Sequence, residues 1–529
     1  MSRVPRRTRL HLSLLGLVAL GLALATASPA HAAEAGGGGG VLLVVAAVVG
    51  LILLGEPLFV IIGVLATLCF FLWGEGYDHY EAYQIFVVKM ANLTTKNVLL
   101  AIPFFVISGA IMTAGGIAER LVSVAKAVVG SLPGGLAMAT VGACIFFAAI
   151  SGSSPVTVIA IGSMIFPALL KEGYGERFSL GLIASAGSLG ILIPPSIPML
   201  VYAIVASATA TVDVGELFLA GVLPGVFLGG LMCTYAFAVG LSARRASGEM
   251  DTARLARTVG GALLLLGGGA LAAWLLARYV PALLVVALLG GSGYFLYRFR
   301  RSFWALLLPI LILGGIYSGL FTPTEAAAVS VVYALVVELF IHRELRPGDV
   351  PGIFVESGVL MGALLVIMAL AFGLNDFLVE AKVPDLAVAA IKEMELSPLG
   401  FLLVVNLLLI VVGFFMDSVS AILIIVPLLV PVARRLGIDP VHLGIVFIVN
   451  LEIGYLTPPI GLNLFVASTV FERPMGTVIR SVLPFIALML VGLGVVTYVP
   501  SLSLGPVNLL LRGKPFYEPL PAGLGEPVP

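Results

Sequence analysis

Two adjacent prolines interrupt a long apolar run in this chain, in the stretch "GILIPPSIP" from Gly190 to Pro198. Each proline lacks a backbone N–H and clashes with the preceding helical turn, so the interior of a helix does not tolerate the pair. The same spacing returns in "GYLTPPIGL", from Gly454 to Leu462. A fold for this chain must therefore contain two broken helices within strongly apolar segments.

The composition indicates what surrounds these breaks. Of the 529 residues, 60% are hydrophobic and 11% are charged, and the mean hydropathy is +1.16. Soluble domains carry roughly 25% charged residues, so the chain is predicted to be an integral membrane protein. Lys plus Arg and Asp plus Glu balance at 28 each, which argues against nucleic acid as a partner. The three cysteines and five histidines show no metal-binding spacing, so no cofactor is predicted.

A membrane-spanning helix needs about 20 mostly apolar residues, and runs of that kind recur along the chain. The sequence is therefore expected to fold as an all-α polytopic membrane protein. The predicted spans lie near 41–54, 57–73, 97–115, 179–206, 215–241, 259–279, 281–297, 303–320, 324–341, 353–374, 441–470 and 480–500.

Two further apolar runs, 136–170 and 400–433, are too long for one span and carry polar residues in the middle. The interruptions are "SGSSP" (Ser151 to Pro155) and "MDS" (Met416 to Ser418). Each arm has only about 15 residues, roughly 22 Å as helix, against a hydrocarbon thickness of about 30 Å. The sequence therefore predicts two re-entrant hairpins, and a pair of full spans at each place is the alternative.

The two ends of the chain carry signals of their own. Residues 1–33 have a basic start, a short apolar stretch and a small-residue end, as a secretory signal peptide has, and a first transmembrane helix is the alternative. Cleavage would leave the mature N-terminus outside the cytoplasm. The loops that are then cytoplasmic are richer in Lys and Arg, as the positive-inside rule requires, with Arg434 and Arg435 as exceptions. Prolines and glycines predict a flexible tail over 501–529.

The chain also repeats itself, because a shift of 264 positions places Gly190 on Gly454 without a gap. Each copy, about 97–206 and about 353–470, contains a span, a hairpin with a polar tip and a span broken at Pro-Pro. Six full crossings and one non-crossing hairpin separate the matching spans, which inverts the second copy. Inverted repeats with discontinuous helices are typical of secondary transporters. The other matching pairs include Gly109 with Gly373, Ser154 with Ser418, Pro167 with Pro431 and Gly173 with Gly437.

The helix breaks and hairpin tips together predict a binding site at the middle of the membrane. Carbonyls freed near Gly190–Ile193 and Gly454–Thr457 can coordinate a hard cation such as Na⁺, as they do in transporters with broken helices. Half-helix N-termini carry partial positive charge and can face an anionic substrate. The tips contribute the polar side chains of Ser151, Ser153, Ser154, Asp417 and Ser418.

Each of these features also has a simpler interpretation. A proline kink without a ligand is common in membrane helices, and an intramembrane serine often bonds back to its own helix. Asp417 is different, because a carboxylate at membrane depth is costly and usually functional. Substrate contact, cation binding and proton coupling are all open to it.

At these residues the chain resembles the large membrane subunit of tripartite ATP-independent periplasmic (TRAP) transporters, the DctM-like family. The resemblance covers about residues 41–500 and rests on "ISGSSPVTVIAIGSMIFPALLKEGY", "GILIPPSIPMLVYA", "GLFTPTEAAAV", "FFMDSVSAILIIVPLLVPVARRLGIDPVHLGI" and "NLEIGYLTPPIGLNLFVAS". It implies a permease domain over 34–500 in the bacterial inner membrane. It also implies a small four-helix membrane subunit, a periplasmic substrate-binding protein and Na⁺-driven import of organic acids, including C4-dicarboxylates and keto acids, by an elevator-type motion.

Carried over to this chain, the resemblance implies two Na⁺ sites and a substrate site. The first Na⁺ site would use Ser151, Gly152, Ser154, Gly190 and Pro194, and the second Met416, Ser418, Gly454, Thr457 and Pro458. The substrate would meet Ser151, Ser196 and Asp417.

Some features depart from the family or favour other functions. Residues 259–297 are predicted to be an inserted pair of helices that the usual subunit lacks. A stand-alone Na⁺/anion symporter without a binding protein is the alternative function. An intramembrane hydrolase is a remote one, because "SGSS" lacks the GxSxG elbow and has no histidine in a motif beside it. The chain is therefore not expected to be an enzyme.

Overall fold

The computed structural model contains helices and no strands in the parts of the chain that it describes. Those parts are residues 58–73, 97–130, 132–207, 209–246, 303–380, 397–415, 417–458 and 461–516, with scattered residues between 43 and 91. The chain divides into two compact units, one formed by 1–96 with 362–390 and the other by 97–361 with 391–529. The predicted signal peptide (1–33) and inserted helix pair (259–297) lie outside the described residues.

The smaller unit contains α4 (Leu58–Trp73) and the part of α17 (Val350–Glu380) that begins at Gly362. The rings of Phe70 and Phe377 lie with their centroids 5.1 Å apart and pack these two helices together. Both helices fall on predicted spans.

The larger unit holds both predicted hairpins and both Pro-Pro breaks. Its first half contains η2 (Asn97–Leu100), α6 (Ala101–Ala114), α7 (Ile117–Val129), α8 (Gly135–Ser151), α9 (Ser154–Lys171), α10 (Glu176–Ser188), η3 (Leu189–Ile191), α11 (Ile197–Ala206) and α12 (Val214–Ala246). The rest contains α15 (Phe303–Tyr317), α16 (Pro323–Val336), η4 (Val337–Ile341), α19 (Pro398–Phe415), α20 (Ser418–Arg435), α21 (Pro440–Gly454), α22 (Leu462–Val470), α23 (Met475–Tyr498), α24 (Ser501–Val507) and η5 (Asn508–Arg512).

Among the described residues, five helices are long and apolar enough to cross a membrane. The pair α6 and α7, bent by 75° between them, makes a sixth if it counts as one span. This content agrees with the all-α polytopic membrane protein that the sequence predicts.

The helix breaks fall where the sequence places them. Helix α8 ends at Gly152, whose φ of 62° is in the left-handed region that favours glycine. Helix α9 begins directly afterwards with Pro155 in its first turn, where the missing N–H costs nothing. In the second copy, α19 and α20 are separated at Met416–Asp417, and Met416 itself lies outside the described residues.

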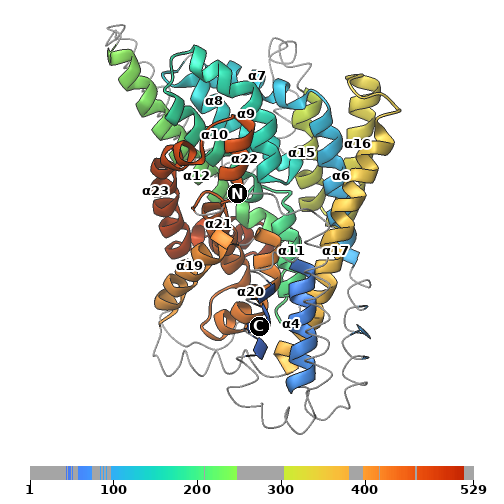
Figure 1. Ribbon diagram of the computed structural model, residues 1–529. Helices are drawn as coiled ribbons and strands as arrows, with labels where there is room; N and C mark the ends of the chain where they lie inside the picture. The colour runs from blue at the N-terminus through green and yellow to red at the C-terminus, as the bar shows by residue number, and fades with distance from the viewer. Residues whose placement is uncertain are drawn as a thin grey trace. The chain divides into compact units, whose positions relative to one another are not determined.

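After each helix break, the second half of the broken helix packs on the hairpin of the other copy. In the first copy α10 and η3 end before Pro194, and α11 begins after Ser196; in the second, α21 ends at Gly454 and α22 begins at Leu462. Helix α11 of the first copy packs on α20 of the second, and α22 of the second packs on α9 of the first. In Figure 1, α8, α9, α10 and α22 lie toward one end of the larger unit, and α11, α19 and α20 lie toward the other.

The C-terminal segment differs from the prediction of a flexible tail over 501–529. Residues 501–512 form α24 and η5, and six of the seven residues of α24 are buried. Helix α24 packs on α12 and α21, so burial outweighs the helix-breaking tendency of Gly505 and Pro506. The prediction was wrong for this segment because composition does not reveal tertiary packing.

Candidate functional site

The tip of the first hairpin is a small network of hydroxyl groups. Ser151 and Ser154 are buried, and Thr157 is fully buried one turn into α9. Ser151 Oγ lies 3.2 Å from Thr157 Oγ1, which in turn donates to the Ser153 carbonyl at 2.9 Å. The tip therefore holds several oxygen atoms in an apolar environment, as a site for a hard cation requires.

The same tip is joined to the second copy by a buried side-chain hydrogen bond. Asn463, in the first turn of α22, donates from Nδ2 to Ser154 Oγ at 2.6 Å. Asn463 is fully buried, and among the described residues no donor bonds to its Oδ1. A carboxamide oxygen in this position is free to coordinate a cation beside the tip.

The first hairpin also lies against the first helix break. A Cβ on Gly152 would stand 3.6 Å from the Pro195 carbonyl oxygen and 3.4 Å from Ile197. A Cβ on Gly190 would stand 2.5 Å from the Ala148 side chain of α8 and 3.6 Å from Thr157 Oγ1. Small residues on both sides thus let the break approach the tip.

The second hairpin tip is tied to the second break by a tyrosine. Tyr455 OH accepts the backbone N–H of Ser418 at 2.9 Å and donates to Ser418 Oγ at 2.7 Å. Asp417 is exposed on the chain and caps α20, because its carboxylate accepts the N–H groups of Val419 and Ser420 and the hydroxyl of Ser420. The capping bonds give Asp417 a structural role beside the functional one predicted for it.

The other predicted residues take different positions around the second break. A Cβ on Gly454 would stand 2.6 Å from the Gly413 Cα, so α19 and α21 cross in backbone contact there. Thr457 Oγ1 donates back to the Ile453 carbonyl at 2.7 Å, and Pro458 is half-buried beside it. Thr457 is thereby bonded to its own helix end, as the simpler interpretation of a membrane hydroxyl expects.

Ser196 and Pro194 are buried at the first break. The Ser196 hydroxyl donates to the Ile191 carbonyl and accepts the Met199 N–H at 3.4 Å, so it caps α11. The Ser196 hydroxyl thus joins the end of η3 to the start of α11. A substrate would have to displace these two hydrogen bonds to reach the hydroxyl.

Sequence reasoning missed four residues of this region: Asn463, Thr157, Tyr455 and Glu452. The first three became visible only through contacts between segments far apart in the chain. Glu452 carried a signal in the sequence, because it is an acidic residue inside the predicted span 441–470.

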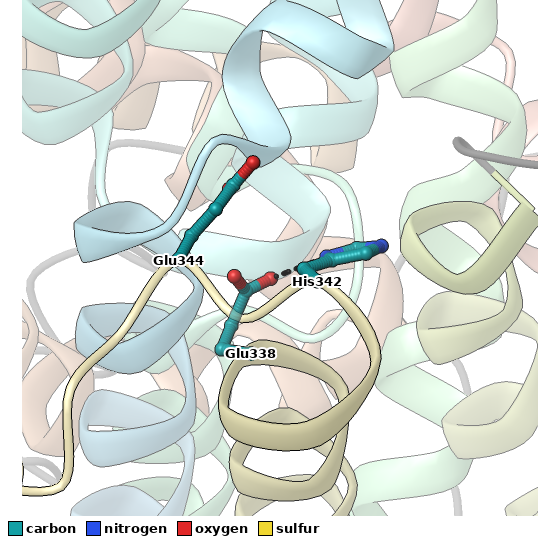
Figure 2. A group of neighbouring side chains, drawn as sticks. All are labelled: Glu338, His342 and Glu344. Atoms are coloured by element: carbon teal, nitrogen blue, oxygen red, sulfur yellow. Dashed lines mark hydrogen bonds and ion pairs between the residues drawn. The ribbon is translucent and has the colours of Figure 1, made fainter.

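A second polar cluster, Glu338, His342 and Glu344, lies in η4 and in the turn that follows it, where α16 and η4 end (Figure 2). Glu338 is fully buried, and its Oε1 lies 3.0 Å from His342 Nδ1. Arg120 of α7 reaches the same nitrogen at 2.9 Å and both oxygens of Glu344. The guanidinium therefore already supplies the positive charge that a metal ion would bring, and the cluster joins α7 to the end of α16.

The helical content, the paired breaks and their oxygen-rich tips define a polytopic membrane transporter. The family model described as the DctM component of tripartite ATP-independent periplasmic transporters matches residues 42–502. The chain belongs to this family, as its sequence motifs indicate.

Relatives and a solved structure agree with this assignment. A C4-dicarboxylate TRAP transporter large permease protein from Pseudomonas aeruginosa is 43% identical over 81% of this chain and 91% of its own. An ectoine TRAP transporter large permease protein from Halomonas elongata is 30% identical over 89% of this chain and 99% of its own. The crystal structure of the Alcanivorax borkumensis YdaH transporter has a TM-score of 0.55 at 16% identity, covering 83% of this chain and 90% of that one, which is a likeness of fold.

Proposed function

We propose that this chain imports an organic acid, with a C4-dicarboxylate as the leading candidate, by coupling its entry to Na⁺. It would act as the large membrane subunit of a three-part transporter in the bacterial inner membrane, with a small membrane subunit and a periplasmic binding protein. The 43% identity to a C4-dicarboxylate permease supports this choice of substrate.

The observation that carries the proposal is that the half-helix after each break packs on the hairpin of the other copy. Helix α9 packs on α22 and α20 packs on α11, and these pairs correspond to each other under the shift of 264 positions. The two hairpins lie toward opposite ends of the larger unit (Figure 1). Such an arrangement is what an inverted repeat would produce, and it supports a transport site between the two tips.

The proposed Na⁺ sites use the oxygens gathered at each tip. Around the first tip these are the hydroxyl of Ser151, the free Oδ1 of Asn463 and carbonyls near Gly190. Around the second they are the hydroxyl of Ser418 and carbonyls near Gly454. Bound cations would offset the charge of a carboxylate substrate in a low-dielectric path, so that the loaded hairpins and broken helices move together against the remaining helices.

Uptake into proteoliposomes that hold the chain, its small subunit and the binding protein tests this function. Succinate uptake should require an inward Na⁺ gradient and fall to background when K⁺ replaces Na⁺. Equal uptake in K⁺ would contradict Na⁺ coupling, and full uptake without the binding protein would show a stand-alone symporter. Ectoine in the same assay tests the substrate class.

A serine pair tests the site. Ser154→Ala removes the acceptor for the buried Asn463 amide, a loss worth about 1–3 kcal/mol, and should reduce Na⁺-dependent uptake several-fold. Ser163→Ala on the same helix is the matched control, because Ser163 is exposed and, in the described part of the chain, its hydroxyl donates to the nearby Ala160 carbonyl of its own helix. Equal Na⁺-dependent uptake by both variants would show that the first hairpin tip is not part of the site.

A further inference from the structure

Helix α21 carries a buried carboxylate that no predicted site uses. Glu452 lies in its last turn and is 0% exposed. Neither of its carboxylate oxygens has a hydrogen-bond partner among the described residues. An isolated carboxylate is very costly to bury, and acidic groups at membrane depth are functional by default.

The backbone near this carboxylate comes from the other copy of the repeat. Helix α21 packs on η3, the last turn before the first Pro-Pro break. The backbone N–H of Leu192 is near the Glu452 carboxylate, but its hydrogen bond goes to the Leu189 carbonyl at 3.2 Å. Glu452 therefore lies where the first break meets the second.

Two helix C-termini meet at this point. The continuous segment of α10 and η3 ends at Ile191, and α21 ends at Gly454, two residues after Glu452. Each C-terminus presents carbonyl groups and the negative end of a helix dipole. Adding a carboxylate to two such ends concentrates negative charge in an apolar region, and this arrangement favours a bound cation.

The basic groups on the elements around α21 do not supply that cation. Arg435 of α20 and Arg480 of α23 are exposed, whereas Glu452 is fully buried. Arg434 of α20 donates to the Thr209 carbonyl at 2.7 Å, and Arg512 pairs with Glu216 and Asp439. His442, on α21 itself, lies ten residues before Glu452, and its ring bonds to Ser503 and the Thr497 carbonyl.

We propose that Glu452 supplies the anionic ligand of a Na⁺ site between the two helix breaks, with backbone carbonyls from both breaks as its neutral ligands. The inference rests on the proposed Na⁺-coupled transport and adds a charged ligand to it. The full negative charge of the carboxylate attracts the cation in addition to the carbonyl dipoles. The site is electrically neutral when Na⁺ is bound.

The test uses the purified chain and the three-component proteoliposomes. Glu452→Gln keeps the size and polarity of the side chain but removes the charge. We expect it to raise the Na⁺ concentration for half-maximal uptake at least tenfold and to abolish the rise in melting temperature that Na⁺ causes in the purified chain. Glu452→Asp, which keeps the charge on a shorter arm, should retain a saturable Na⁺ effect with weaker affinity.

Glu119→Gln is the matched control, because Glu119 is exposed on α7 and the substitution changes net charge equally. It should behave as the wild type does. A wild-type uptake rate that does not change with Na⁺ concentration would overturn the proposed function itself. Wild-type uptake that needs Na⁺, with Glu452→Gln showing the same Na⁺ curve and the same Na⁺-dependent melting shift, would overturn only the role of Glu452. If Glu452→Gln cannot be purified, a Glu452→Asp curve identical to the wild type has the same meaning.

Discussion

Tyr455 is the residue that fixes the second hairpin tip to the second helix break. It is buried directly after α21, and its hydroxyl makes two hydrogen bonds to Ser418 at the start of α20. The backbone N–H of Ser418 is in the first turn of α20, where an N–H has no partner within the helix. A side chain from another segment therefore completes this helix start.

Tyr455→Phe should leave the Ser418 N–H without a partner and free the tip to move. Losing a hydrogen bond of this kind costs about 1–3 kcal/mol, so we expect a lower melting temperature and weaker Na⁺-dependent uptake. Tyr333→Phe is the control, since Tyr333 OH donates at 2.7 Å to the Trp304 carbonyl of α15 and makes no bond to either tip among the described residues. Similar losses of Na⁺ dependence in both variants would show that the effect is one of general stability.

The individual site residues were only partly predictable from the sequence. The rule that acidic groups at membrane depth are functional selected Asp417, which the structure places at an exposed helix cap. The same rule applies more strongly to Glu452, which the sequence prediction passed over although it lies in "NLEIGYLTPPIGLNLFVAS", two residues before Gly454. Asn463 could not be found this way, because its importance depends on a contact with Ser154 across 309 positions.

At the scale of elements, α19 and α21 cross with two glycines in contact. Gly413 and Gly454 face each other so closely that a Cβ on Gly413 would stand 2.9 Å from the Gly454 Cα. Small residues at helix crossings let backbones approach in membranes, where the packing itself holds helices together. The crossing places the first arm of the second hairpin directly on the second helix break.

Gly413→Ala should push α19 from α21 and lower the melting temperature. Overpacking costs about 1–3 kcal/mol, and here the obstacle is backbone, which cannot rotate away. Gly494→Ala in α23 is the control, because its Cβ would meet nothing within 4 Å. That variant should be neutral or slightly stabilising through helix propensity. Equal melting temperatures for both variants would contradict a tight crossing.

The elements themselves were predictable because glycine and proline dictate backbone shape locally. The breaks at Gly152 and before Pro194 follow from residue type alone, and both appear where expected. The residues after Gly116 fall between the predicted span 97–115 and the apolar run 136–170, yet they form α7. Because α7 contains the charged residues Glu119 and Lys126, a search for apolar runs does not detect it. A bend of 75° separates α7 from α6.

At the scale of the whole molecule, the end of the described chain fastens the larger unit. Arg512 makes two hydrogen bonds to Glu216 in the first turn of α12, at 2.9 and 2.6 Å, and one to Asp439 at 2.5 Å. The Glu216 and then the Asp439 carboxylate raise the pKa of Arg512 above its already high usual value. The cation is therefore present at every physiological pH.

Arg512→Ala should remove the contact that joins η5 to the starts of α12 and α21. Hydrogen bonds to charged groups contribute about 1.5–3 kcal/mol, so the melting temperature should fall, while Lys514→Ala, an exposed neighbour, should leave it unchanged. The Arg512 variant should show the same loss across pH 6 to 9, because the arginine that it removes keeps its charge throughout that range. A loss equal to that of Lys514→Ala would contradict a fastening role for the C-terminal segment.

The contact made by Arg512 also bears on how the protein is made. Synthesis proceeds from the N-terminus, so α12 and α21 leave the ribosome before their common partner exists. Until residue 512 has emerged, the acidic groups at the starts of these helices face their surroundings without it. A segment translated after both helices therefore holds their starts together, and a chain that stops before residue 512 would enter the bilayer without this contact.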